Sequence, residues 1–296
     1  MNFSVIIPHS NIPEYLTRCI SSIPEREDIE VIVVDNSTIP VDLEVCALHR
    51  TNVHFLFSSP KRGAGGARNE GIVHSRGKWL LFCDADDYFM PNAFSVFDSH
   101  CDDSEDIIFF NATSCNLVND VPSRRHHCVS NYIKEYNRTR NEHNLRFYSN
   151  IPWAKMINSQ LVLNNHFFFD EVVVRNDVMF SLKTGFAASM IAVDDSVVYC
   201  VTEREDSLTT KLSLDTVYCD FKVRSRANKY LSNHGLKRFY PISSDLVFIR
   251  QHDFVLYLSC LIVSIIRRDY FVDFRKRLTR WMERWFQKVK NYLRNK

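Results

Sequence analysis

The first hundred residues alternate short apolar runs with helix-like segments, and this alternation restricts the fold more than any other feature. The apolar runs are FSVIIP (3–8), EVIVVD (30–35), NVHFLF (52–57) and WLLFCD (79–84). Segments with helical spacing or a helix-like start stand between them. Strands with continuous apolar sequence are buried on both faces, which is typical of parallel sheets covered by helices. We therefore expect an α/β fold with a parallel sheet that helices cover on both faces.

A proline and two carboxylates stand where three of these runs end. Pro8 closes the first run, Asp35 the second and Asp84 the fourth, which continues into the acidic sequence DADD. In such sheets ligands bind at the carboxyl ends of the strands. Alternation along an extended chain places Asp84 and Asp86 on the same side. Mg²⁺ and Mn²⁺ take one or two carboxylates together with phosphate oxygens and water. A solvated acidic turn is the alternative.

The stretch RGAGGARNEG (62–71) holds four of the chain's seven glycines. Glycine is typical of places where the backbone must approach something closely. A dinucleotide fingerprint needs GxGxxG after the first strand. Here the stretch follows the third strand, and Arg68 occupies the last glycine position. A P-loop needs a Lys-Ser/Thr pair that is also missing. We expect a glycine loop that leads into a helix near Ala67; a flexible loop with no ligand is the alternative.

In combination, SVIIP, VIVVDNST, GAGGARNEGI and LLFCDADDYFMP resemble the nucleotide-sugar-binding half of family 2 glycosyltransferases. The resemblance covers residues 3–97 well and continues more loosely to about 210. It implies the GT-A fold, a Rossmann-like α/β domain with a mixed, mostly parallel sheet flanked by helices. We expect a donor-binding half at 1–115, an acceptor-binding half at 116–206, and a helical C-terminal region at 207–296.

The resemblance places the nucleotide base and ribose against the first two strand ends. Pro8, His9 and Ser10 match the wall around the base. Asp35 and Asn36 match an acidic pair that contacts uracil or ribose. Many members of the family have Asp-Asp there, so the base contact at Asn36 departs from the family pattern.

The resemblance also assigns the phosphate side of the donor. Arg68 and Asn69, at the helix start, match the pair that contacts the nucleotide. Asp84 would face the ribose and diphosphate, and Asp86 would ligate Mn²⁺ or Mg²⁺ between the two phosphates. Arg204 matches a position near the diphosphate, with a surface salt bridge as the alternative.

On the acceptor side, the family carries a catalytic base at the start of a helix. The match is Asp177 in VVVRNDVMFSLK, with Asn176 where the family often has Glu. A carboxylate there would accept the proton of an acceptor hydroxyl, which is otherwise a poor nucleophile. Capping of the helix is the alternative. Trp153 could stack on an acceptor sugar, and burial in the core is equally compatible with its sequence.

Charge is spread unevenly along the chain. The net charge is only +2, but residues 267–296 contain eleven Lys and Arg against three Asp and Glu. Their aromatic residues, including Trp281 and Trp285, recur at helical spacing. Such a helix suits an anionic membrane interface or docking on the domain or a second subunit. The body is acidic and has no recognition motif, which disfavours nucleic-acid binding.

The remaining features indicate a cytoplasmic protein. None of the nine cysteines forms a CxxC pair, so we expect reduced, buried thiols rather than disulfides or a zinc site. The start MNFSVIIPHS has no basic n-region, so we expect no signal peptide. The longest apolar run, 254–266, has thirteen residues, fewer than the ~20 that span a bilayer.

Together these features predict a metal-dependent, inverting glycosyltransferase. By resemblance, it would transfer a sugar from a UDP-linked donor to a glycan or lipid-linked acceptor in bacterial surface polysaccharide synthesis, such as O-antigen, capsule or lipooligosaccharide. Peripheral contact with the inner face of the membrane and homodimer formation remain open. The alternatives are an inactive relative that binds a synthase complex, and a sugar nucleotidyltransferase. The sequence PHSNIP after the first strand lacks the glycine-rich loop that a nucleotidyltransferase carries there.

Overall fold

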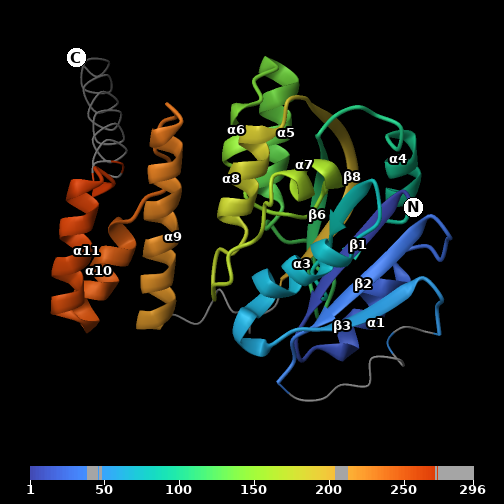
Figure 1. Ribbon diagram of the computed structural model, residues 1–296, viewed down its shortest axis with the longest axis horizontal. Helices are drawn as coiled ribbons and strands as arrows, with labels where there is room; N and C mark the ends of the chain where they lie inside the picture. The colour runs from blue at the N-terminus through green and yellow to red at the C-terminus, as the bar shows by residue number, and fades with distance from the viewer. Residues whose placement is uncertain (39–45, 47–48, 204–212, 271, 273–296) are drawn as a thin grey trace, which may run out of the picture. The chain divides into compact units, whose positions relative to one another are not determined.

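The computed structural model describes residues 1–38, 46, 49–203, 213–270 and 272 (Figure 1). Within them, eight strands form one sheet in the order β3-β2-β1-β4-β7-β6-β8-β5. The strands are β1 (Phe3–His9), β2 (Ile29–Asp35), β3 (Val53–Phe57), β4 (Trp79–Phe82), β5 (Tyr88–Phe89), β6 (Ile107–Asn116), β7 (Lys155–Asn158) and β8 (Ile191–Glu203). Strands β1 to β4 pair in parallel with one another, and β6 pairs in parallel with β8. The pairings of β7 and of β5 are antiparallel. The expected mixed, mostly parallel sheet is confirmed.

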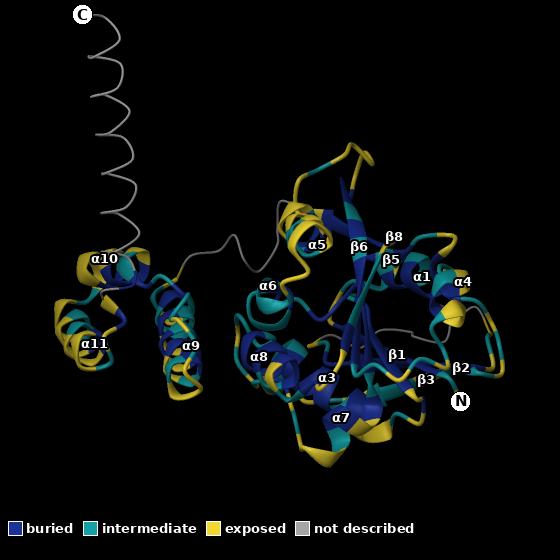
Figure 2. Cartoon of the chain, turned by 90° about the horizontal axis from the view of Figure 1, so that it is seen from above, coloured by how far each residue is buried: buried dark blue, intermediate teal, exposed yellow. Residues whose placement is uncertain are grey.

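Helices cover both faces of this sheet, which is why β1, β2 and β4 are largely apolar. Every residue of β1 and β2 is buried. Figure 2 shows α1 (Pro13–Ser21) and α4 (Ala93–Ser99) on one side and α3 (Gly63–His74) with α8 (Val178–Ala187) on the other. A continuous apolar core joins both sides of the sheet. Among the described residues, this part of the chain also contains η1 (Pro60–Arg62), α5 (His127–Thr139), α6 (His143–Phe147) and α7 (Ser159–Asn164).

The chain divides into two compact units, Met1–Thr210 and Lys211–Lys296. The second unit contains α9 (Leu214–Asn233), α10 (Ser243–His252) and α11 (Phe254–Ile266). Its own small core includes Phe221, Ile242 and Ile249. None of the helices described here combines the length and the apolar character that crossing a membrane requires. Most of the basic tail expected at 267–296 lies outside the described residues.

Several local expectations need correction. The glycine stretch is not a loop, because α3 already begins at Gly63. Strand β4 ends at Phe82, two residues before Asp84. Asp194 and Asp195 look from sequence like a surface loop without partners. They lie instead within β8, where Asp194 Oδ2 lies 3.0 Å from His100 Nε2 and Asp195 Oδ1 accepts a 3.0 Å hydrogen bond from Asn111 Nδ2.

Candidate active site

The acidic segment between β4 and β5 divides into one structural carboxylate and two that reach the surface. Asp87 is buried, and its two oxygens accept hydrogen bonds of 2.7 Å from the Tyr199 hydroxyl and from the Thr202 backbone N–H, both on β8. Burial and the neighbouring carboxylates raise the pKa of Asp87 well above its usual range. Asp84 and Asp86 are half-buried. They are therefore the carboxylates that a ligand can meet.

Arg68 joins this acidic segment to the loop that precedes α8. Its side chain is only 7% exposed. Nη2 donates a 2.5 Å hydrogen bond to Asp84 Oδ1, and Nη1 donates one of 2.8 Å to Asn176 Oδ1. The guanidinium also lies over the Phe169 ring, 5.3 Å from its centre. One arginine thus connects the acidic segment with the residue beside Asp177.

The glycines of α3 explain how that loop comes so close. A Cβ atom at Gly65 would overlap with the backbone carbonyl of Asp170 and would crowd the Cβ of Asn176. Only glycine leaves space for the loop at this turn of the helix. What approaches the glycine stretch most closely is therefore the protein's own chain, and this contact brings Asn176 within reach of Arg68.

Asp177 occupies the position before the first residue of α8, but its side chain makes no capping hydrogen bond. The carboxyl group is half-buried. Burial raises its pKa, the charge of Asp84 acts in the same direction, and the charge of Arg68 opposes them. A carboxylate with a raised pKa is a stronger proton acceptor, which is the property that a general base needs.

Lys155 is a buried ionisable group near this site that sequence reasoning did not single out. It lies on β7, two residues after Trp153, and its Nζ donates a 2.7 Å hydrogen bond to the backbone oxygen of Ser149. Burial lowers its pKa to about 7, while the charge of Asp177 acts to raise it. The available signal was a lysine inside an otherwise apolar segment, IPWAKMI.

The first two strand ends form a second, well-ordered group. Strands β1 and β2 pair His9 with Asp35. The Ile12 N–H donates to His9 Nε2 at 3.2 Å, so His9 carries its proton on Nδ1 and donates to Asp35 Oδ1 at 2.8 Å. Ser37 also bonds to Oδ1, through both its N–H and its hydroxyl. Among the described residues, the side-chain hydrogen bonds of Asp35 all go to Oδ1, so Oδ2 is the oxygen that a ligand could engage.

The neighbours of this pair occupy different environments. Asn36 is buried, and its backbone N–H donates to the His9 carbonyl at 3.0 Å. Pro8 is buried at the end of β1, and Ser10 is exposed just beyond it. Pro8, Asp35 and Asn36 therefore meet at one edge of the sheet, as the order of the strands predicts.

Two other expected site residues have their side chains engaged within the protein. Asn69 Nδ2 donates to the Phe169 carbonyl at 3.0 Å, and the Phe169 N–H donates to Asn69 Oδ1 at 2.7 Å. Trp153 is 6% exposed and stacks on Tyr199, with ring centres 5.2 Å apart and an interplanar angle of 3°. Arg204 lies outside the described residues.

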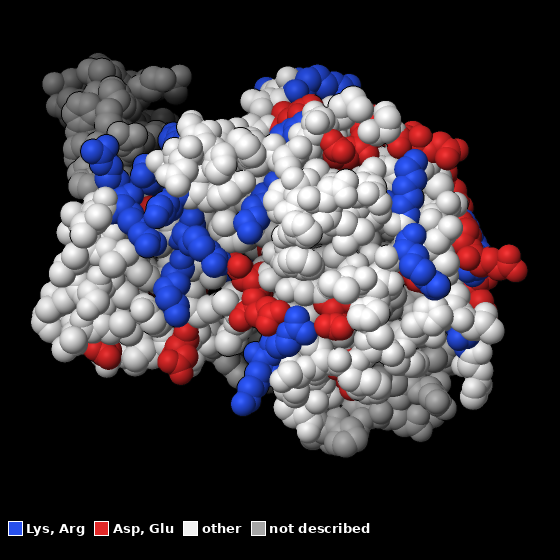
Figure 3. All heavy atoms as spheres, viewed as in Figure 1, with Lys and Arg blue, Asp and Glu red and all other residues white. Residues whose placement is uncertain are grey.

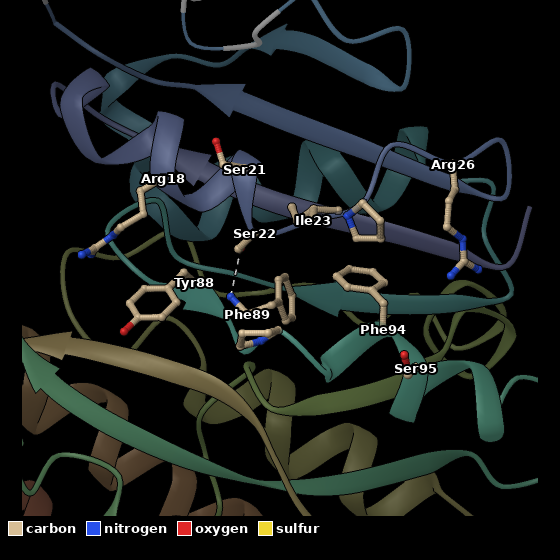
Figure 4. A pocket seen from close by; sticks show the side chains of 11 residues that line it. Arg18, Ser21, Ser22, Ile23, Arg26, Tyr88, Phe89, Phe94 and Ser95 are labelled. Carbon is tan, nitrogen blue, oxygen red and sulfur yellow. Dashed lines mark hydrogen bonds between the residues drawn. The ribbon is translucent and has the colours of Figure 1, made fainter.

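A separate pocket of about 660 Å³ lies between α1, β5 and α4. Figure 4 shows Tyr88 and Phe94 along it, with Arg18 and Arg26 at its two ends. Arg18 Nη2 donates a 2.8 Å hydrogen bond to the backbone oxygen of Asp86. The pocket thus touches the backbone of the acidic segment, but none of the residues gathered around Arg68 lines it.

The chain is similar to many known proteins, among them two relatives by sequence and one solved structure. Staphylococcus aureus (strain Mu50) poly(ribitol-phosphate) beta-N-acetylglucosaminyltransferase TarS is 26% identical over 218 residues, covering 69% of this chain and 36% of TarS. The Rhizobium meliloti succinoglycan biosynthesis protein ExoO is 25% identical over 226 residues, covering 72% of this chain and 64% of ExoO. The chain thus spans less than two thirds of the length of these relatives. A crystal structure of S. aureus TarS 1–349 with UDP-GlcNAc superposes with a TM-score of 0.64 at 22% identity, covering 83% of this chain and 70% of that one.

The structural match confirms the expected GT-A fold. The sequence match defines the family, because the family model described as glycosyl transferase family 2 fits residues 4–165, more than half of the chain. These residues include both strand ends, α3 and the acidic segment. The chain belongs to glycosyl transferase family 2.

Proposed function

We propose that the chain is an inverting glycosyltransferase that uses a UDP-linked sugar. The family supports sugar transfer. The structural neighbour that holds UDP-GlcNAc supports a uridine nucleotide. The names of TarS and ExoO refer to a poly(ribitol-phosphate) and to succinoglycan biosynthesis. By likeness, the acceptor would be a hydroxyl group of a bacterial surface polysaccharide or of its lipid-linked precursor.

The observation that carries this proposal is the bridge made by Arg68. Its two hydrogen bonds hold Asp84, on the donor side, and Asn176, beside the candidate base, in a fixed relation. Fixed placement of two reacting groups removes entropy from the barrier. Asp177 would accept the proton of the acceptor hydroxyl as its oxygen attacks the anomeric carbon. Attack opposite the leaving diphosphate inverts the configuration of that carbon.

The base and ribose would lie against the first two strand ends. His9 and Ser37 bond to Oδ1 of Asp35, so Oδ2 would be the oxygen that accepts a hydrogen bond from the nucleotide. A ribose hydroxyl or the N–H of uracil can donate to such an oxygen. Pro8, Ser10 and Asn36 would complete this wall, and Arg204 would reach the diphosphate.

The acidic segment fits a divalent cation of the Mg²⁺ or Mn²⁺ type. Asp86 would be the ligand, with Asp84 beside it, because both carboxylates are half-buried after a strand end. No group of three or more metal-ligating side chains occurs within the part of the chain that the structure describes. Such cations commonly complete their shell with phosphate oxygens and water. When bound, the cation would neutralise charge on the leaving diphosphate.

Calorimetry of nucleotide binding tests the donor site. UDP, GDP, TDP and CDP are each titrated with and without Mn²⁺ into the wild type, into Asp86→Ala and into Asp102→Ala, an exposed carboxylate outside the site. We expect UDP to bind most tightly, to need Mn²⁺, and to lose affinity in Asp86→Ala alone. Binding of no nucleotide, or binding indifferent to Mn²⁺ and to Asp86, would favour an inactive relative that binds a partner protein.

A further inference from the structure

The helix α11 is apolar on nearly all sides, and Ser259 is its one exposed polar residue. Its sequence FVLYLSCLIVSII contains no charged residue. One side packs on the core of the second unit, through residues such as Tyr257, Cys260 and Leu261. An amphipathic helix of a soluble protein normally presents polar residues on the opposite side. In α11 that side is also hydrophobic.

The exposed side of α11 forms a continuous apolar stripe. Val255, Leu258, Ile262 and Ile266 follow one another at helical spacing, and their exposed fractions are 76%, 43%, 58% and 75%. Phe254, Val263 and Ile265 widen the stripe on its two sides. Large contiguous apolar patches on a protein surface commonly mark sites of protein or membrane contact.

The charge around this stripe distinguishes between possible occupants. Residues 211–296 contain nineteen Lys and Arg against seven Asp and Glu, whereas residues 1–210 contain eighteen against twenty-eight. In the view of Figure 3, Lys and Arg side chains gather over α9, while the atoms over α11 are mostly uncharged. Arg250 and Arg268 are exposed near the two ends of α11. A second copy of this chain would bring the same positive charge, whereas an anionic lipid surface brings the opposite one.

We propose that the exposed stripe of α11, defined by Val255, Leu258, Ile262 and Ile266, docks on an anionic lipid surface. Thirteen residues rise about 20 Å, less than the ~30 Å of a bilayer's hydrocarbon core. The helix would therefore lie along the interface, with its apolar side chains in the acyl boundary and the flanking arginines at the headgroups. This inference rests on the second unit alone and does not depend on the proposed transferase activity.

Vesicle flotation with the full chain tests this inference. The vesicles are pure phosphatidylcholine or phosphatidylcholine mixed with phosphatidylglycerol. The variant Val255→Ser/Ile266→Ser removes the two most exposed members of the stripe. The matched control Val118→Ser/Val121→Ser changes two valines of the first unit that are 86% and 55% exposed. We expect the wild type and the control to float with the anionic vesicles, and the α11 variant to lose roughly tenfold or more in affinity.

The other results would overturn the proposal. They are the absence of flotation for the wild type, equal flotation with neutral vesicles, and equal losses in the two double variants. Sedimentation of the same proteins without lipid detects the competing occupant. A concentration-dependent dimer that the α11 variant alone abolishes would assign the stripe to a second copy of the chain. The exchanged side chains are exposed, so we expect both variants to fold normally. An unchanged thermal midpoint checks that each variant is folded.

Discussion

Asp177 is the single residue for which two interpretations predict opposite results. The Asp177 side chain makes no capping hydrogen bond, and Asn caps helices about as well as Asp, so Asp177→Asn would leave activity unchanged if the residue only formed the start of α8. If Asp177 is the general base, Asp177→Asn should lower kcat by about 10²–10⁴-fold and should retain UDP binding. Burial penalises the charged carboxylate, so the thermal midpoint should also rise. Turnover and calorimetry on the same preparation check this. Full activity in the variant would remove Asp177 from the mechanism.

The raised pKa of Asp177 predicts the pH dependence of the reaction. A base works when deprotonated, so kcat/KM should rise with pH through the pKa of Asp177, above the usual value of about 3.9 for Asp. Arg68 holds this pKa down, so Arg68→Met should move the acid limb to higher pH. Arg62→Met is the matched control, because Arg62 pairs with Glu70 and Glu171 instead. An acid limb that stays in place in Arg68→Met would contradict the assignment.

The burial of Lys155 predicts how the free energy of unfolding changes with pH. Its pKa is about 7 in the folded chain and about 10.4 when unfolded, so between these values the unfolded chain binds more protons. The free energy of unfolding should therefore rise with pH from about 7 to about 10 through this group. Lys155→Met should be more stable at pH 7 and should lack this rise, whereas the exposed Lys134→Met should keep it. Denaturant unfolding at several pH values measures both. Identical pH dependence in wild type and Lys155→Met would show that the lysine is solvated.

At the scale of elements, the contact of α3 with the loop before α8 assembles the proposed site. In Gly65→Ala the new methyl group meets the Asp170 carbonyl, and overpacking of this kind costs about 1–3 kcal/mol. We expect a lower thermal midpoint and a loss of kcat larger than the loss of UDP affinity, because the displaced loop carries Asn176 and Asp177. Val73→Ala, on the exposed side of the same helix, serves as control. A normal kcat in a destabilised Gly65→Ala would separate the packing of this helix from catalysis.

The elements also show how far the sequence could predict this structure. The strands and their polar ends could be predicted, because continuous apolar runs leave few other arrangements. The role of Gly65 could not, because its neighbour Asp170 is more than a hundred residues away in the chain. Similarly, the sequence DADD does not reveal which carboxylate is structural. That choice depends on Tyr199 and Thr202, which β8 brings from the far end of the domain.

At the scale of the whole molecule, the reactivity of the cysteine thiols can be used to follow the unfolding of each of the two units. All nine thiols are free, and six of them are buried: Cys19, Cys46, Cys83, Cys115, Cys200 and Cys260. The expectation of buried thiols holds for these six, whereas Cys128 is exposed and Cys101 and Cys219 are half-buried. Burial raises the pKa of Cys83, of Cys200 and of Cys260. Because the thiolate is the reactive form, these groups should react only when the chain opens.

Thiol labelling across a denaturant series should therefore proceed in stages. In native buffer we expect fast modification of Cys128 and slower modification of Cys101 and Cys219, with the six buried thiols protected. Cys260 is the one buried cysteine of the second unit, whose described core is small. We expect it to become reactive at a lower denaturant concentration than the five buried thiols of the first unit. Mass spectrometry of the labelled peptides measures each site. Simultaneous exposure of all six would mean that the two units unfold as one cooperative structure.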